Sequence, residues 1–302
     1  METHVIPGAR FVDPKVLSRI RDLELMARTV VDGFINGLHR APFFGASIDF
    51  AEHRGYVAGD DIRRVDWRLY ARTDRYYVKQ YEADTNANFA VLFDVSKSMG
   101  FASQGITKLE YGKFLAACLA YLSHRQRDRV GITTFDEDIV TRVPVSAKHF
   151  NVLLHTLDRA EPQRPGRLLD VLKRSAEHFK RRSIVAIISD FYENPDDLLD
   201  ALKPFSFIGN DVVVFHVLDP AEIDFPYRDA SRFQDLESGE EVPVVPEVFA
   251  EQYRKMMQEH IEAIRSKCSE ARIDYVQLNT AKPLDEALFH YLGNRERLMR
   301  IR

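Results

Sequence analysis

From about residue 87 onward, short apolar runs alternate with longer segments in which apolar residues recur every three or four positions. Runs that are apolar throughout are typical of strands buried on both faces, and the longer segments have the period of amphipathic helices. The expected strands are 88–94, 129–135, 139–143, 184–188, 212–218 and 275–278, with 139–143 as an antiparallel edge strand. The expected helices are 107–125, 148–159, 167–180, 196–203, 247–269 and 284–299. The alternation predicts an α/β fold with a doubly wound, mostly parallel sheet flanked by helices.

Two further segments precede this region. Residues 1–40 form an N-terminal amphipathic helical segment: Asp13 and Pro14 mark a helix start, and one apolar stripe runs on to Phe34. Because the helix has one apolar face, we expect it to pack against its own domain. Residues 41–86 read as a small β-rich extension, with a strand at 76–81, and residues 87–302 as the α/β domain.

Composition narrows the function classes. The 302 residues are 45% hydrophobic and 29% charged with a net charge of −4, which is ordinary for a globular protein and gives no general attraction to nucleic acid. No apolar run approaches the length of a membrane span, and the first residues lack a signal-peptide pattern. Cys118 and Cys268 both fall on apolar helix stripes and read as core thiols, so we expect a cytoplasmic location.

Three side-chain oxygens follow the first buried strand at alternate positions, on Asp94, Ser96 and Ser98. Asp190 follows another buried strand, and the carboxyl ends of parallel strands meet at one edge of a sheet. Carboxylate and hydroxyl oxygens suit a small hard cation such as Mg²⁺ or Mn²⁺, with water completing the coordination. Asp and Ser also favour turns and helix starts for purely local reasons. The pattern therefore predicts a polar edge with a candidate metal site of few anionic ligands.

The Asp94-x-Ser96-x-Ser98 loop, the Ser189-Asp190 strand end and the alternating elements resemble a von Willebrand factor type A domain with its metal-ion-dependent adhesion site, a Rossmann-like fold. Residues upstream resemble the signature of the domain-of-unknown-function 58 family, whose members are bacterial or archaeal. The signature positions are Arg54, Tyr56, Gly59, Asp60, Asp61, Arg63, Asp66, Trp67 and Arg72. We interpret them as a structural network, because acids are interleaved with the arginines.

The chain departs from the adhesion-site pattern at one position. Such sites also use a threonine from a later loop, and here Arg167 stands at the corresponding place in Pro165-Gly166-Arg167. A guanidinium near Asp94 and Asp190 would replace the cation electrostatically. The site is therefore either a metal site or a pseudo-site that carries its own positive charge.

The resemblance implies a non-enzymatic adaptor that works with a MoxR-type AAA+ ATPase in the assembly or maturation of other complexes, and binds a partner at the Asp94-x-Ser96-x-Ser98 edge. Two alternatives stay open: a metal-dependent phosphohydrolase, and RNA or nucleotide binding through the arginines at 63–75. Against the first, Ser96 stands where a second carboxylate is needed, and no nucleophile–base pair is evident. An acidic excursion at 219–246 predicts a hairpin with its tip at Ser238-Gly239, interpreted either as a partner-docking element or as a lid over the sheet edge.

Overall fold

The computed structural model describes residues 13–20, 22–40, 53–55, 67–79, 87–179, 182–229, 231–285, 287–289 and 291. Its centre is a six-stranded sheet in the order β10-β7-β6-β3-β4-β5. The strands are β3 (Asn88–Asp94), β4 (Arg129–Phe135), β5 (Ile139–Ser146), β6 (Ser183–Ser189), β7 (Asp211–Leu218) and β10 (Asp274–Asn279). All neighbours pair in parallel except β5, which runs antiparallel to β4 at the edge. The predicted doubly wound, mostly parallel sheet and its antiparallel edge strand are confirmed.

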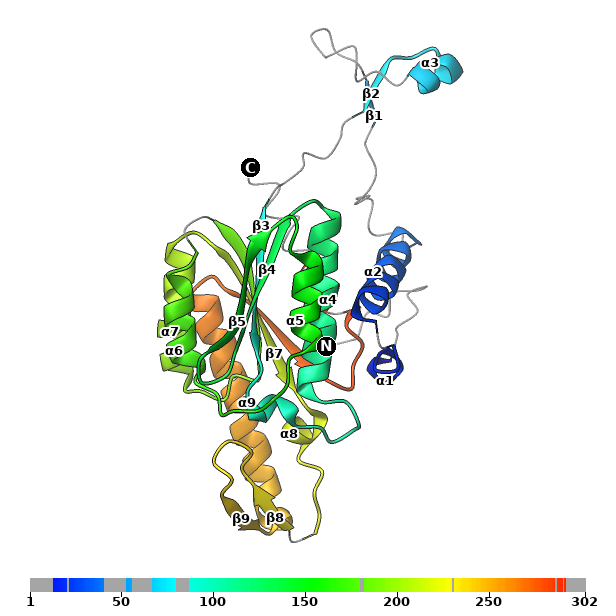
Figure 1. Cartoon of the computed structure of the whole chain (residues 1–302). Coiled ribbons are helices and arrows are strands. Elements are labelled where there is room, and N and C mark those ends of the chain that lie inside the picture. The colour runs from blue at the N-terminus through cyan, green and yellow to red at the C-terminus, as the bar shows by residue number, and fades with distance from the viewer. Residues whose placement is uncertain are drawn as a thin grey trace.

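Helices cover both faces of the sheet (Figure 1). One face carries α4 (Lys108–Arg125) and α5 (Phe150–Asp158), and the other carries α6 (Leu168–Ala176), α7 (Pro195–Phe207) and α9 (Pro246–Glu270). Side chains alternate between the two cores: Phe89, Val91 and Phe93 of β3 join the first, and Leu92 joins the second. Because both faces are buried, every residue of β3 after Asn88 is buried, which explains the uninterrupted apolar run in the sequence.

The N-terminal stripe forms two helices instead of one. Helix α1 (Pro14–Leu17) begins at Asp13, whose side chain accepts a hydrogen bond from the Lys15 N–H (2.8 Å), and α2 (Leu23–Arg40) follows after a turn. Helix α2 packs against α4, and its Met26 and Val31 are fully buried in the first core. The chain's own domain therefore covers the apolar face of α2.

The segment between α2 and the sheet is described only in part. Strand β1 (His53–Gly55) pairs antiparallel with β2 (Tyr77–Lys79), which accounts for the strand predicted at 76–81, and α3 (Trp67–Thr73) lies between them in sequence. Trp67 is 54% exposed and meets Tyr70 and Tyr76 edge-on. Six signature positions lie outside the described residues, so the proposed Arg–carboxylate network stays a prediction: Tyr56, Gly59, Asp60, Asp61, Arg63 and Asp66.

The predicted hairpin is present in the excursion after β7. Strand β8 (Ser231–Gln234) pairs antiparallel with β9 (Glu241–Val244), with Phe233 opposite Val242. A short helix, α8 (Pro220–Asp224), precedes the hairpin and was not predicted. In Figure 1 the hairpin lies beside the beginning of α9, at the end of the molecule where β3 and β6 finish. Within the described residues, no helix combines the length and apolar character that crossing a membrane requires.

Candidate functional site

The candidate site is the polar rim formed by the Asp94–Ser98 loop, Ser189-Asp190 and the loop 164–167. Asp94 is almost completely buried at the end of β3. Its Oδ1 accepts a hydrogen bond from the Ser96 N–H (2.9 Å), and its Oδ2 accepts one from the Ser189 hydroxyl (2.6 Å). The pKa of Asp94 is raised to about 7, mainly by burial and then by the nearby Asp190 carboxylate, while hydrogen bonds from Ser189 and Ser96 act in the opposite direction.

The two serines lie together beside Asp94. The hydroxyl oxygens of Ser96 and Ser98 are 3.1 Å apart, within hydrogen-bond distance. The loop 164–167 lies against them: the Lys97 N–H donates to the Arg164 carbonyl (2.9 Å), and a Cβ added to Gly166 would lie 3.1 Å from the Ser96 Cβ. Glycine at position 166 therefore allows the loop to approach the rim closely. The predicted grouping of the two serines with Asp94 is present in the structure.

Asp190 makes a buried ion pair. The Lys108 ammonium lies 2.7 Å from Asp190 Oδ2 and 2.6 Å from Glu222 Oε1, and the Lys108 side chain is fully buried. Burial alone lowers the pKa of Lys108, but the two carboxylates outweigh it and raise that pKa. Burial raises the pKa of Glu222, which the ammonium opposes. Lys108 thus remains charged and fixes Asp190 as one member of a three-residue network.

Lys108 was missed by the sequence reasoning, which selected Arg167 as the cation near Asp190. Arg167 is exposed at the N-cap of α6, where its backbone N–H donates to the Asp136 carbonyl (3.0 Å). The structure assigns the cation that contacts Asp190 to Lys108, and a role of Arg167 toward the rim stays a prediction. Two signals pointed to Lys108: it shares the buried stripe of α4 with Tyr111, and its charge in the first helical turn opposes the helix dipole.

A second missed residue reaches the rim from the hairpin. The Glu237 carboxylate accepts hydrogen bonds from the Ser98 N–H (2.9 Å to Oε1) and the Gly166 N–H (2.7 Å to Oε2). Glu237 lies in the loop between β8 and β9, more than one hundred residues from Ser98. The segment Asp235-x-Glu237-x-Gly239-Glu240 resembles the family, but the sequence did not predict that Glu237 contacts the rim, because several neighbouring acids share the same local pattern.

The rim has an oxygen set of the kind that Mg²⁺ or Mn²⁺ binds. Asp94 and the paired hydroxyls of Ser96 and Ser98 are hard donors, and a cation would relieve the unfavourable burial of the Asp94 carboxylate. Glu193 adds a nearby acid, whose pKa burial raises to about 7 with a further contribution from Asp94. No cluster of three or more His, Cys, Asp or Glu with metal-ligand geometry occurs among the described residues. Cation binding at the rim therefore stays a prediction.

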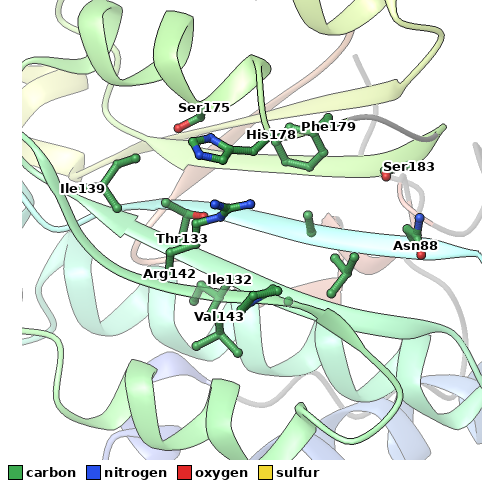
Figure 2. A pocket seen from close by; sticks show the side chains of 14 residues that line it. Asn88, Ile132, Thr133, Ile139, Arg142, Val143, Ser175, His178, Phe179 and Ser183 are labelled. Atoms are coloured by element: carbon green, nitrogen blue, oxygen red, sulfur yellow. The ribbon is translucent and has the colours of Figure 1, made fainter.

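A separate cavity of about 280 Å³ lies over β4 and β5, beside the end of α6. Figure 2 shows Arg142 and His178 among the side chains that line it, together with Ser175, whose buried hydroxyl has no hydrogen-bond partner among the described residues. None of the lining residues belongs to the polar rim. Gly131 also lines the cavity. A Cβ at this position would lie 2.7 Å from the Val143 carbonyl of β5, so glycine there allows β5 to bulge toward β4.

The sheet order and the helices on both faces give a doubly wound fold of the von Willebrand factor type A-like kind. The chain is similar to an aerotolerance-related membrane protein from Bacteroides fragilis, with a TM-score of 0.50 and 17% identity, over 69% of this chain and 99% of that one. It is also similar to BatB from Bacteroides thetaiotaomicron, with a TM-score of 0.49 and 16% identity, over 70% and 99% of the two chains. At these identities the likeness concerns the fold.

The chain belongs to the family described as "Protein of unknown function DUF58", whose pattern matches residues 52–266. An uncharacterised protein of Mycobacterium tuberculosis is 30% identical over 236 residues, which are 75% of this chain and 73% of the relative. The resemblance stated from the sequence is therefore confirmed at the level of family and fold.

Proposed function

We propose that this protein is a non-enzymatic interaction module that binds an acidic side chain of a partner protein at the polar rim. The observation that carries this proposal is the carboxylate already bound there: two rim N–H groups, of Ser98 and Gly166, each donate to one oxygen of Glu237. Backbone N–H groups that converge on a carboxylate form a binding site for anions.

Contacts within the protein hold both rim acids in place. Both oxygens of Asp94 accept hydrogen bonds from protein donors, and Asp190 is held by the Lys108 ammonium. A carboxylate has about four lone-pair sites on its two oxygens, so Asp94 can accept these two hydrogen bonds and still bind a cation. Mg²⁺ or Mn²⁺, if bound, would be held by Asp94, Ser96 and Ser98 and would supply a positive charge facing a partner's carboxylate.

The finer form of the proposal concerns the partner and the compartment. Family resemblance supports a MoxR-type AAA+ ATPase, acting in the assembly or maturation of other complexes, as the partner. The two buried free thiols, Cys118 and Cys268, support a cytoplasmic location.

The test is affinity capture by the full chain from its native cell, with identification of the retained proteins. We expect wild type to retain a MoxR-type ATPase, and the Gly166→Pro variant, which lacks one of the two N–H donors, to retain at least tenfold less. Thr156→Ala is the control for a substitution away from the rim, because its hydroxyl donates to the Val152 carbonyl within α5. Equal retention by the rim variant would contradict the proposal. So would Mg²⁺-dependent phosphatase turnover that disappears in Asp94→Ala.

A further inference from the structure

We propose that Glu237 is an internal ligand of the rim, so that the hairpin tip occupies the place that a partner's acidic loop takes when it binds. The binding site is the cradle formed by the Ser98 and Gly166 N–H groups, and its ligand class is a glutamate presented at the tip of a tight loop. This inference rests on the proposed function, since it names the ligand and the regulation of the same rim.

The cradle matches a carboxylate in number and direction. It offers two N–H donors, and each is bonded to a different oxygen of Glu237 at 2.9 and 2.7 Å. A glutamine in the same place would offer one acceptor, and its amide nitrogen would face an N–H donor. A Cβ on Gly166 would crowd Ser96, so the glycine is what brings the second donor close to the first. The cradle therefore distinguishes a carboxylate from its neutral amide analogue.

The hairpin tip is folded to present this one side chain. Asp235 accepts hydrogen bonds from the N–H groups of Glu237 (2.7 Å) and Ser238 (3.0 Å), and these contacts hold the pKa of Asp235 below its usual range. Gly239 then turns the chain with a φ of +77°, a conformation that favours glycine. The turn is thus fixed by its own contacts and directs Glu237 toward the rim.

The base of the hairpin is anchored elsewhere. Phe233 of β8 packs against Phe225 and Tyr227, with ring centroids 5.6 and 4.9 Å apart, and Phe225 packs against Tyr253 of α9 at 4.6 Å. At the tip, by contrast, Glu237 makes all the hydrogen bonds that join loop 235–240 to the rim within the described residues. The tip can therefore leave the rim while the aromatic cluster keeps the hairpin attached.

Tethering makes Glu237 a strong competitor. A ligand held on the same chain by a short connection acts at an effective concentration in the millimolar range. A partner loop at micromolar concentration must displace it, so wild type binds acidic ligands weakly until a partner with additional contacts engages the rim. Removal of the Glu237 carboxylate should expose the cradle.

The experiment uses the full chain and a head-to-tail cyclised, fluorescently labelled peptide of residues 231–244, because an open two-stranded hairpin is only marginally stable. We expect the peptide to bind Glu237→Ala at least tenfold more tightly than wild type, and the same peptide carrying Glu237→Gln to bind neither protein. Glu240→Ala removes a neighbouring exposed acid of the same loop and should behave as wild type.

Amide NMR signals of Ser98 and Gly166 provide a second measurement that needs no ligand. Loss of the Glu237 carboxylate should shift both amide protons upfield, while Glu240→Ala leaves them unchanged, and the cyclic peptide should restore them in Glu237→Ala. Unchanged signals in Glu237→Ala would overturn the inference. Equal peptide affinity for wild type and Glu237→Ala, or no binding to either, would do so as well.

The two proposals can fail separately. If the peptide does not discriminate but Gly166→Pro still loses its partner, the rim binds partners without internal competition. If the peptide discriminates as expected but Gly166→Pro retains its partner, Glu237 occupies the cradle and partner binding occurs elsewhere.

Discussion

Replacement of Asp94 by asparagine should change how the stability of this protein depends on pH. Burial raises the pKa of Asp94 from 3.8 to about 7 in the folded chain. The folded state therefore favours the neutral acid, and its stability is full below about pH 4 and falls as the pH rises toward 7. A difference of about 3 pKa units corresponds to about 4 kcal/mol of unfolding free energy.

Asparagine keeps the local contacts without the charge. Its carbonyl can accept the Ser96 N–H, and its amide can donate to the Ser189 hydroxyl, which rotates to accept. Urea unfolding of wild type and Asp94→Asn at a series of pH values between 4 and 8 gives the difference in unfolding free energy between them. We expect Asp94→Asn to gain about 4 kcal/mol relative to wild type across this range, because only wild type must bury a charge there.

Asp138→Asn provides a control, because the pKa of Asp138 is shifted in the opposite direction to that of Asp94. The Ile139 N–H and then Arg174 lower the pKa of Asp138, so its ionised form favours folding at neutral pH. This variant should be less stable than wild type by a constant amount between about pH 5 and 8, and the deficit should shrink only as the pH falls through about 4. A difference for Asp94→Asn that stays constant with pH would refute the reasoning about its burial.

Millimolar Mg²⁺ should stabilise wild type near pH 7 and leave Asp94→Asn unchanged, and an equal response of both proteins would contradict a cation held by Asp94.

Two further predictions concern packing. Lys108→Met leaves Asp190 buried without its counter-charge and should cost about 3–5 kcal/mol of unfolding free energy. Lys113→Met on the same helix is the control and should cost less than about 1 kcal/mol. Denaturant titrations measure both, and equal losses would contradict the importance of the buried ion pair. Gly112→Ala places a Cβ 2.6 Å from the ring of a β3 phenylalanine and should destabilise the fold by about 1–3 kcal/mol. Gly33→Ala, which has open space around it, should stabilise the fold by about 0.5–1 kcal/mol. Thermal unfolding measures both, and a stability change of the same sign in the two variants would refute the packing argument.

Much of the fold could be predicted from the sequence because burial imposes a local pattern. A strand covered on both faces must be apolar throughout, as β3 and β6 are, and a helix on one face must repeat its apolar residues every three or four positions. The same logic placed Asp94 and Asp190 together, because both follow strands that run in parallel and end at one edge. One apolar stripe in the sequence can still be divided between two helices, as the turn between α1 and α2 shows.

The sequence by itself determined the α/β architecture, the edge at which the polar residues gather and the type of atoms that they offer. Only the tertiary structure decided which charges meet there. Lys108 contacts Asp190 across 82 positions of the chain, and Glu237 contacts Ser98 across 139. Contacts at such separations produce no periodic pattern in the sequence. The physical reason is that local patterns record which face of an element is buried, whereas contacts between distant polar groups depend on how the elements pack against one another.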